Sequence, residues 1–134
     1  AMDLISGNNH YLICDEYLLN NKQKLLFHVQ NNWFNLDLNK PVYINLNSLL
    51  DKSLDWKNKS IAFIGEKWNN QNPFDIAILC TPKKRNECIL NTINSEILVF
   101  RSVKSDFPHN LFNSLKNKSS LYNISISGAY IHDI

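Results

Sequence analysis

The chain is 134 residues long, 44% of its residues are hydrophobic, and it contains only three Gly and four Pro. This length fits one domain with a real core, and the composition excludes a disordered chain. The net charge of +2 neither demands nor excludes a nucleic-acid partner. No apolar run approaches the roughly 20 residues that span a bilayer. We therefore expect one cytoplasmic domain over residues 1–134, with no membrane partner and with Ala1 as a cloning remnant.

Asparagine occupies 21 of the 134 positions and often stands in pairs such as Asn69-Asn70. Because Asn, Lys, Ile and Leu have AT-rich codons, this bias indicates an AT-rich genome, and a single Asn is weak evidence for a site. The three cysteines are Cys14, Cys80 and Cys88, and the first two stand in apolar runs that are typical of buried thiols. Reduced thiols agree with a cytoplasmic location.

The first predicted element is a helix over residues 15–34. Leu18, Leu25, Val29 and Trp33 recur at helical spacing, and Asp15 can cap the helix start. The alternative is a pair of strands, residues 25–29 and 33–38, that turn at residues 30–32. The sequence leaves both interpretations open.

The middle of the chain predicts three strands. Residues 42–46 alternate as a strand after Pro41, and Asn47 or Ser48 can cap a short helical stretch that runs to residue 54. Residues 55–60 are polar and indicate a loop. The apolar runs 60–65 and 75–81 predict two strands that pair as a hairpin around a loop at residues 66–74.

The last third predicts a strand, a helix and a final strand. Residues 88–93 fit either a helix or a strand, whereas residues 96–103 alternate as a strand. Residues 105–108 form a helix start with Pro in the first turn, and Leu111, Phe112 and Leu115 supply its apolar face. A final strand is expected over residues 122–127, with a continuation at residues 129–131.

Together these elements predict an α+β fold. We expect a mainly antiparallel sheet of four to six strands with two or three helices packed on it.

No catalytic or metal-binding motif stands out. His10 and Cys14 are four residues apart, but two ligands do not make a metal site, and no paired ligands of the structural-zinc kind occur. A triad from Cys14, His28 or His10, and Asp15 can be drawn, although three cysteines and four histidines make such a set easy to find by chance. The three glycines stand far apart and exclude a phosphate-binding loop. We therefore predict no catalytic residue, no metal and no cofactor.

Two further charged sets have simple explanations. His109 and the tail pair His132-Asp133 could contribute to acid–base chemistry, but tail residues are usually mobile and solvated. Lys83-Lys84-Arg85, with Arg101 and Lys104, is a short basic set of the kind that a solvated loop carries. We expect no nucleic-acid partner.

The best candidate for a binding surface surrounds two tryptophans. Trp56 and Trp68 stand in or beside polar segments, and Trp is enriched at interface hot spots. The predicted binding residues are Asp55, Trp56, Glu66, Trp68, Asn69, Asn70 and Asp75. The alternative is that both indoles cover the ends of the predicted hairpin and are mostly buried.

In its length, single-domain build and lack of an active-site motif, the chain resembles the small immunity proteins of contact-dependent growth inhibition and related polymorphic toxin systems. The resemblance implies a non-catalytic cytoplasmic protein, a monomer or weak dimer, that binds one cognate toxin domain, often a nuclease, and covers its active site. Immunity proteins against basic nucleases are frequently acidic, and the net charge of +2 departs from that pattern. The alternatives are a small hydrolase with a Cys/His site and a small-molecule sensor or subunit of a complex.

Overall fold

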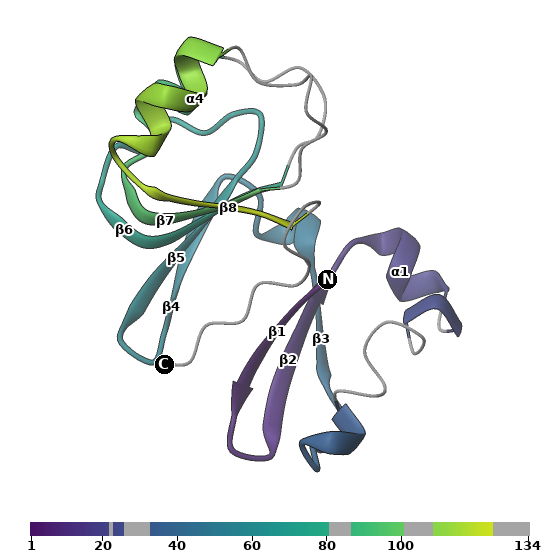
Figure 1. The fold of residues 1–134 in the computed structure, drawn as a ribbon. Helices are drawn as coiled ribbons and strands as arrows, with labels where there is room; N and C mark the ends of the chain where they lie inside the picture. The colour runs from purple at the N-terminus through teal and green to yellow at the C-terminus, as the bar shows by residue number, and fades with distance from the viewer. Residues whose placement is uncertain (22, 26–32, 81–86, 101–108, 125–134) are drawn as a thin grey trace. The chain divides into compact units, whose positions relative to one another are not determined.

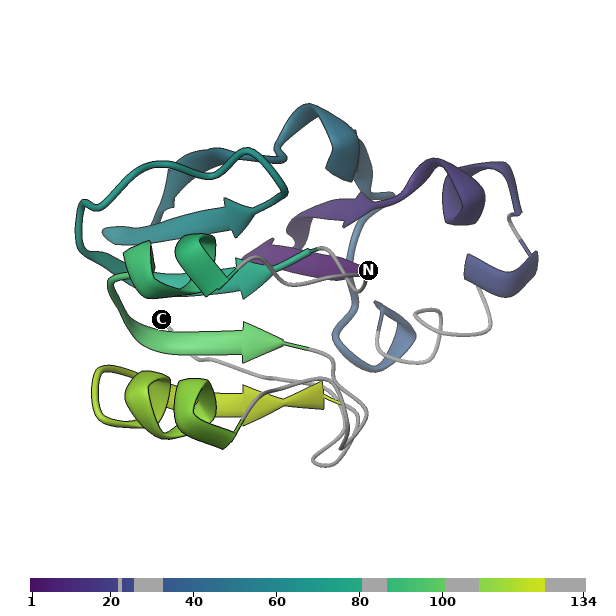
Figure 2. The same ribbon diagram turned by 90° about the horizontal axis from the view of Figure 1, so that it is seen from above.

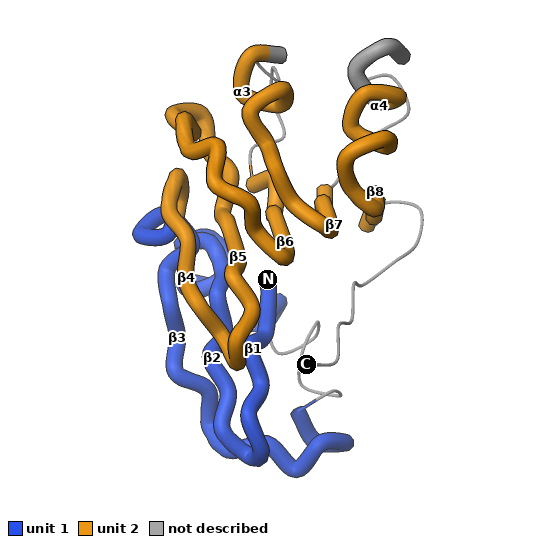
Figure 3. The backbone as a smooth tube through the Cα atoms, turned by 90° about the vertical axis from the view of Figure 1, so that its left-hand side faces the viewer, with its two compact units in different colours: residues 1–49 blue, residues 50–134 orange. Residues whose placement is uncertain are grey.

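The computed structural model describes residues 1–21, 23–25, 33–80, 87–100 and 109–124. Contacts within the chain group it into two compact units, residues 1–49 and residues 50–134, and each unit has its own sheet (Figures 1 and 3). The sequence predicted one domain over residues 1–134. Each of the two units buries its own set of apolar side chains.

The first unit is built on a three-stranded sheet in the order β1-β2-β3 (Figure 1). Strands β1 (Met2–Ser6) and β2 (Asn9–Cys14) form an antiparallel hairpin, and β3 (Val42–Asn45) joins β2 in parallel. The hairpin turn is Gly7-Asn8, in which Gly7 has a φ of 57°. Glycine adopts this left-handed conformation without a steric penalty, which suits it to a two-residue turn.

Helix α1 (Glu16–Asn20) follows β2 directly. Its cap is Asp15, as predicted, since the Asp15 carboxylate accepts a hydrogen bond from Leu18 N at 2.8 Å. The predicted continuous helix over residues 15–34 is interrupted, because α1 ends at Asn20 with Asn21 as its C-cap. Asn21 Oδ1 then accepts a 3.4 Å hydrogen bond from Lys24 N in the next helical residues, 23–25. Asn favours such side-chain bonds at helix ends over a place inside a helix.

The alternative pair of strands is also not found in the described residues, since residues 33–35 are helical. Residues 26–32 lie outside the described part of the chain. The helical segments cover one face of the sheet. A core forms there from three fully buried residues and three partly buried ones: Leu12, Cys14, Leu25, Leu18, Leu19 and Trp33.

The second unit holds a five-stranded sheet in sequential order, β4-β5-β6-β7-β8. Its strands are β4 (Lys52–Trp56), β5 (Lys59–Ile64), β6 (Phe74–Leu79), β7 (Ser95–Phe100) and β8 (Ser120–Asn123). Strand β4 pairs with β5 in antiparallel fashion, and every later neighbour pair is parallel. Figure 2 shows this in the green and yellow arrows of β7 and β8, which point the same way.

The predicted mainly antiparallel sheet with two or three packed helices is therefore wrong. The described residues contain eight strands in two sheets and only short helices, and the larger sheet is mostly parallel. The predicted hairpin of residues 60–65 and 75–81 is wrong for the same reason, because β5 and β6 run parallel. Strand β5 is buried on both faces from Ile61 to Ile64, and such continuous apolar runs are typical of parallel strands.

Two helices cover one face of the larger sheet, α3 (Glu87–Thr92) and α4 (His109–Lys116). Figure 3 shows both on the same side of the strands. Successive right-handed crossovers that advance in one direction place their connections on one face, which accounts for this arrangement. The core beneath them is apolar: Ala62, Ile64, Trp68, Phe74, Ala77, Leu90, Ile93, Leu98, Phe100 and Leu115.

Several local predictions are corrected. The helical stretch predicted to start at Asn47 or Ser48 is a single 3-10 turn, Leu46–Ser48, and its cap is Asn45. Residues 55–60, predicted as a loop, form the β4–β5 hairpin, while residues 88–93 resolve mainly as α3. The helix start at residues 105–108 and the continuations of the last two strands, at 101–103 and beyond 124, lie outside the described residues. No helix in the described residues has the length and apolar character to cross a bilayer.

Candidate functional site

Trp68, at the centre of the surface predicted from the sequence, lies in the core of the second unit. Trp68 is 5% exposed, and its ring meets Phe74 edge-on with the centroids 5.6 Å apart. Within the described residues, no group accepts a hydrogen bond from Trp68 Nε1. The indole therefore offers no face to a partner in this conformation.

Asp75 ties the starts of β5 and β6 together. Its carboxylate accepts hydrogen bonds from Lys59 Nζ, Ser60 N and Ser60 Oγ, each at 2.8 Å. The bond from Lys59, followed by those from Ser60, holds the pKa of Asp75 well below its usual range, and the same contact raises the pKa of Lys59. The carboxylate is thus engaged inside the unit.

The other five predicted binding residues do not meet on one surface. Asp55, Glu66 and Asn69 are exposed, and Trp56 and Asn70 are half-buried. Asp55 and Trp56 pair with the first residues of β5, whereas Glu66 follows its far end. At about 3.3 Å per residue the length of β5 separates the two ends by about 20 Å.

His10 and Cys14 both lie on β2 and do not form a catalytic pair. Four residues along a strand separate their Cα atoms by about 13 Å, whereas the same spacing on a helix would bring them together. Cys14 is 1% exposed, and burial is the largest cause of its raised pKa. Residue His28 of the suggested triad lies outside the described residues.

Cys80, just after β6, is also poorly suited to nucleophilic chemistry. Burial, reinforced by the nearby charge of Asp51, raises the pKa of Cys80 to about 12, so the reactive thiolate is scarce at neutral pH. Cys88 is exposed. No group of three or more His, Cys, Asp or Glu side chains that could hold a metal ion occurs in the described part of the chain.

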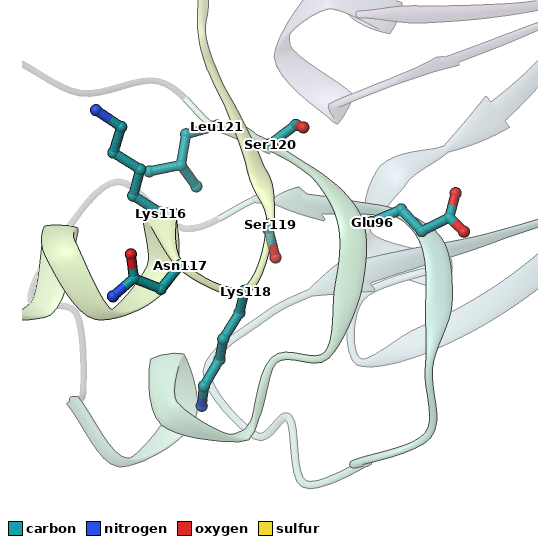
Figure 4. Close-up of a pocket in the computed structure, with 7 residues that line it drawn as sticks. All are labelled: Glu96, Lys116, Asn117, Lys118, Ser119, Ser120 and Leu121. Atoms are coloured by element: carbon teal, nitrogen blue, oxygen red, sulfur yellow. The ribbon is translucent and has the colours of Figure 1, made fainter.

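A shallow hollow lies beside the turn between α4 and β8 (Figure 4). Its lining includes Glu96, Lys116, Lys118 and Ser119, and Figure 4 shows the long side chains of the first three pointing away from one another. Ser119 Oγ donates a 2.6 Å hydrogen bond to the Ser95 carbonyl oxygen. The hollow also sits at the amino ends of β7 and β8, whereas open parallel sheets bind ligands at the carboxyl ends of their strands.

Among the side chains that the structure describes, the exposed apolar ones concentrate in the first unit. Phe34 is 87% exposed, Tyr17 is 61% exposed, and Leu36 and Val42 are each 55% exposed. Among the residues whose side chains the structure describes, the exposed large hydrophobic residues of the first unit are Tyr11, Tyr17, Phe34, Leu36, Val42 and Tyr43, and that of the second unit is Ile124.

The predicted surface did not include any of these residues, although one signal for them was present. In a helix, adjacent residues point about 100° apart, so a side chain next to one that points into the core can point away from it. Trp33 packs inward and Phe34 is left outside. The sequence does not say which of the two is buried.

A buried polar cluster holds the segment that carries Phe34. His10 Nδ1 lies 2.9 Å from Asp3 Oδ1, and His10 Nε2 lies 2.8 Å from the Asn39 carbonyl oxygen. Trp33 Nε1 donates a 2.7 Å hydrogen bond to Asp3 Oδ2. The imidazole thus links β1, β2 and Asn39, and Trp33 is tied to β1 directly through Asp3.

Comparisons of the chain with protein-family models, with curated proteins and with solved structures give no match.

Proposed function

We propose that this protein is a non-catalytic binding protein that neutralises a cognate bacterial toxin domain by covering its active site. The observation that carries the proposal is the exposure of Phe34, Leu36, Tyr17 and Val42 in the first unit. Large apolar side chains that stay exposed in the folded state cost free energy, and they are the groups that interfaces bury.

The chemistry of the described residues favours binding over catalysis. The thiols of Cys14 and Cys80 have raised pKa values, and the ring nitrogens of His10 are both engaged. A nucleophile needs an adjacent base or a lowered pKa. Neither condition is met by these three side chains.

The proposed contact surface is the set of exposed apolar residues of the first unit, with Phe34 and Leu36 as its main anchors. Aromatic anchors dominate interface energies, and alanine substitution of one such residue typically costs about 2 kcal/mol or more. Glu66 and Asn69, which are exposed members of the set predicted from the sequence, provide a competing site in the second unit for the test.

The test is direct binding to the variable C-terminal domain of a large secreted protein encoded next to this gene, measured by calorimetry with purified proteins. We expect association below micromolar concentration and rescue of cells that express the toxin domain. Phe34→Ala combined with Leu36→Ala should weaken binding by at least about 30-fold.

Two matched controls separate the surfaces. Ile124→Ala removes an exposed apolar side chain from the second unit and should leave the affinity unchanged. Glu66→Ala combined with Asn69→Ala tests the competing site. A loss of affinity in that variant alone would show that the interface lies on the second unit. A failure to associate with the toxin domain or to rescue cells would reject the proposed function itself.

A further inference from the structure

The imidazole of His10 sits between two hydrogen-bond acceptors. Its side chain is fully shielded from solvent. Nδ1 faces the Asp3 carboxylate at 2.9 Å, and Nε2 faces the Asn39 carbonyl at 2.8 Å. The ring also meets Trp33 edge-on, with the centroids 5.0 Å apart.

This geometry fixes the number of protons that the cluster needs. A carbonyl oxygen only accepts, so Nε2 must carry a proton to bond Asn39. An ionised Asp3 carboxylate also only accepts, so Nδ1 must then carry a second proton. A neutral imidazole beside an ionised Asp3 satisfies one neighbour and turns a lone pair toward the other.

The same cluster anchors both ends of residues 33–39. Trp33 is bound through Asp3 Oδ2. Asn39 is bound through His10, through a 2.8 Å hydrogen bond from Asn39 N to the Asn8 carbonyl, and through a 3.2 Å hydrogen bond from Asn39 Nδ2 to Asn9 Oδ1. Between the anchors, a hydrogen bond of 3.0 Å from Leu38 N to the Trp33 carbonyl closes the turn. The segment is therefore held as a unit against the β1–β2 hairpin.

We propose that His10 is a proton-operated latch, which fixes residues 33–39 to the β1–β2 hairpin through both ring nitrogens when the ring carries two protons, and which loosens them when one proton, and with it one of these two hydrogen bonds, is lost. The direction follows from the proton count. The latch is closed at lower pH, where the ring is an imidazolium, and it opens as the pH rises and the ring becomes neutral.

In the described part of the first unit, few other charges bear on the ring. From β1 the ionisable neighbour in contact is Asp3. On β2 the thiol of Cys14 lies on the same face and is neutral, because burial raises its pKa. The charged side chains of the latched segment and its flank, Asp37 and Lys40, are exposed and screened by water. Asp3 is thus the partner that makes the second ring proton necessary.

The latch carries Phe34 and Leu36, which lie between its two anchors. Opening it would disperse these two side chains and so weaken the proposed interface. This consequence rests on the proposed function, whereas the latch itself is testable on the protein alone.

The test is a pH series on the intact protein with ¹⁵N-labelled histidine and tryptophan. We expect the His10 ring to show both nitrogens protonated at the acidic end of the series. At the pH at which the ring loses a proton, hydrogen exchange at the Trp33 indole N–H should also accelerate, by about tenfold or more. His10→Gln identifies the His10 signals and should make the Trp33 exchange independent of this transition.

Two results would overturn the latch. One is a ring that titrates while the Trp33 indole signal and its exchange rate stay constant. The other is a ring with a single proton throughout the series and a fully protected Trp33. Neither result depends on a partner, so failure of the latch and failure of the proposed function are distinguishable.

Discussion

The two units differ in the interactions that stabilise each of them internally. The core under α3 and α4 in the second unit is built from apolar side chains, and the buried indole nitrogen of Trp68 within it has no hydrogen-bond partner among the described residues. In the first unit, the apolar core around Leu12 continues into the hydrogen-bonded cluster of His10, Asp3 and Trp33. The stability of an apolar core depends on how well its volume is filled, whereas the stability of a polar cluster depends on the protonation of its members and on each hydrogen-bond partner.

The largest effect is expected from a cavity in the second unit. Leu98 is fully buried in β7, and Leu98→Ala should lower the free energy of unfolding by about 3–4 kcal/mol, because it removes buried methyl groups and leaves a void. Denaturant unfolding gives the magnitude. Hydrogen exchange across residues 1–49 in the same variant shows whether the first unit loosens with the second. A cost below about 1 kcal/mol would mean that this core can collapse around the gap.

The next effect tests the polar cluster. Asp3→Ala should cost about 2–3 kcal/mol, because it leaves the buried His10 ring and the Trp33 indole N–H without their acceptor. Denaturant unfolding at constant pH is the measurement. Asp3→Asn is the matched control, since its amide oxygen can still accept one of the two bonds and should restore part of the loss. Equal costs for the two variants would show that the charge of Asp3 matters more than its hydrogen bonds.

The same contrast explains what the sequence could predict. The apolar runs of β5 and β6 were recognisable as strands, since burial on both faces leaves a continuous hydrophobic stretch, and β7 was recognisable from its alternating residues. The direction in which β5 and β6 pair was not predicted correctly. Because the two strands are close along the chain, a hairpin was expected, but the loop at residues 65–73 returns the chain to the start of a parallel strand. The same continuous stretches were a signal for parallel pairing that the prediction did not use.

Polar clusters and exposed residues are harder to predict. From the sequence Asp3 looks like a surface residue, and only the hairpin register, which pairs Asp3 with Leu12 and Ile5 with His10, brings its carboxylate to the His10 ring. Trp68 and Phe34 are both aromatic residues near polar segments, yet one is 5% exposed and the other 87%. Which of the two rings is buried depends on the path of the chain in three dimensions, and local composition does not determine that path.

A third prediction compares the two glycine positions. An added Cβ at Gly65 would lie 2.8 Å from both carboxylate oxygens of Asp51, and Asp51 Oδ1 already accepts a 2.9 Å hydrogen bond from Gly65 N. Gly65→Ala should therefore cost about 1–2 kcal/mol through this contact. At Gly7 in the first unit no atom lies within 4 Å of the added Cβ, so Gly7→Ala should cost about 1 kcal/mol through its positive φ alone.

A double-mutant cycle separates these two causes. In an Asp51→Ala background the cost of Gly65→Ala should fall by about 1 kcal/mol, because the clashing carboxylate is gone. The cost of Gly7→Ala should stay the same in that background. Additive costs for Gly65 and Asp51 would show that the backbone moves to relieve the contact.

The smallest expected effects are gains in stability, from substitutions of residues whose backbone is in the left-handed conformation. Lys57 and Asn58, with φ of 47° and 63°, form the β4–β5 turn, and Asp37 in the first unit has a φ of 50°. A two-residue turn with both φ values positive favours Asn-Gly, so Lys57→Asn combined with Asn58→Gly should raise the free energy of unfolding by about 0.5–1 kcal/mol.

Asp37→Gly is the matched change in the first unit. Asp37 N bonds the Phe34 carbonyl at 3.3 Å and Leu38 N bonds that of Trp33, which is the pattern that ends a helix with glycine in the left-handed position. Relief of the positive φ should therefore stabilise the turn by about 0.5 kcal/mol. Because this turn lies inside the latched segment, the gain should slow Trp33 indole exchange at every pH without moving the pH at which that exchange accelerates. A shift of that pH would mean that the turn, and not the His10 ring, sets the release of residues 33–39.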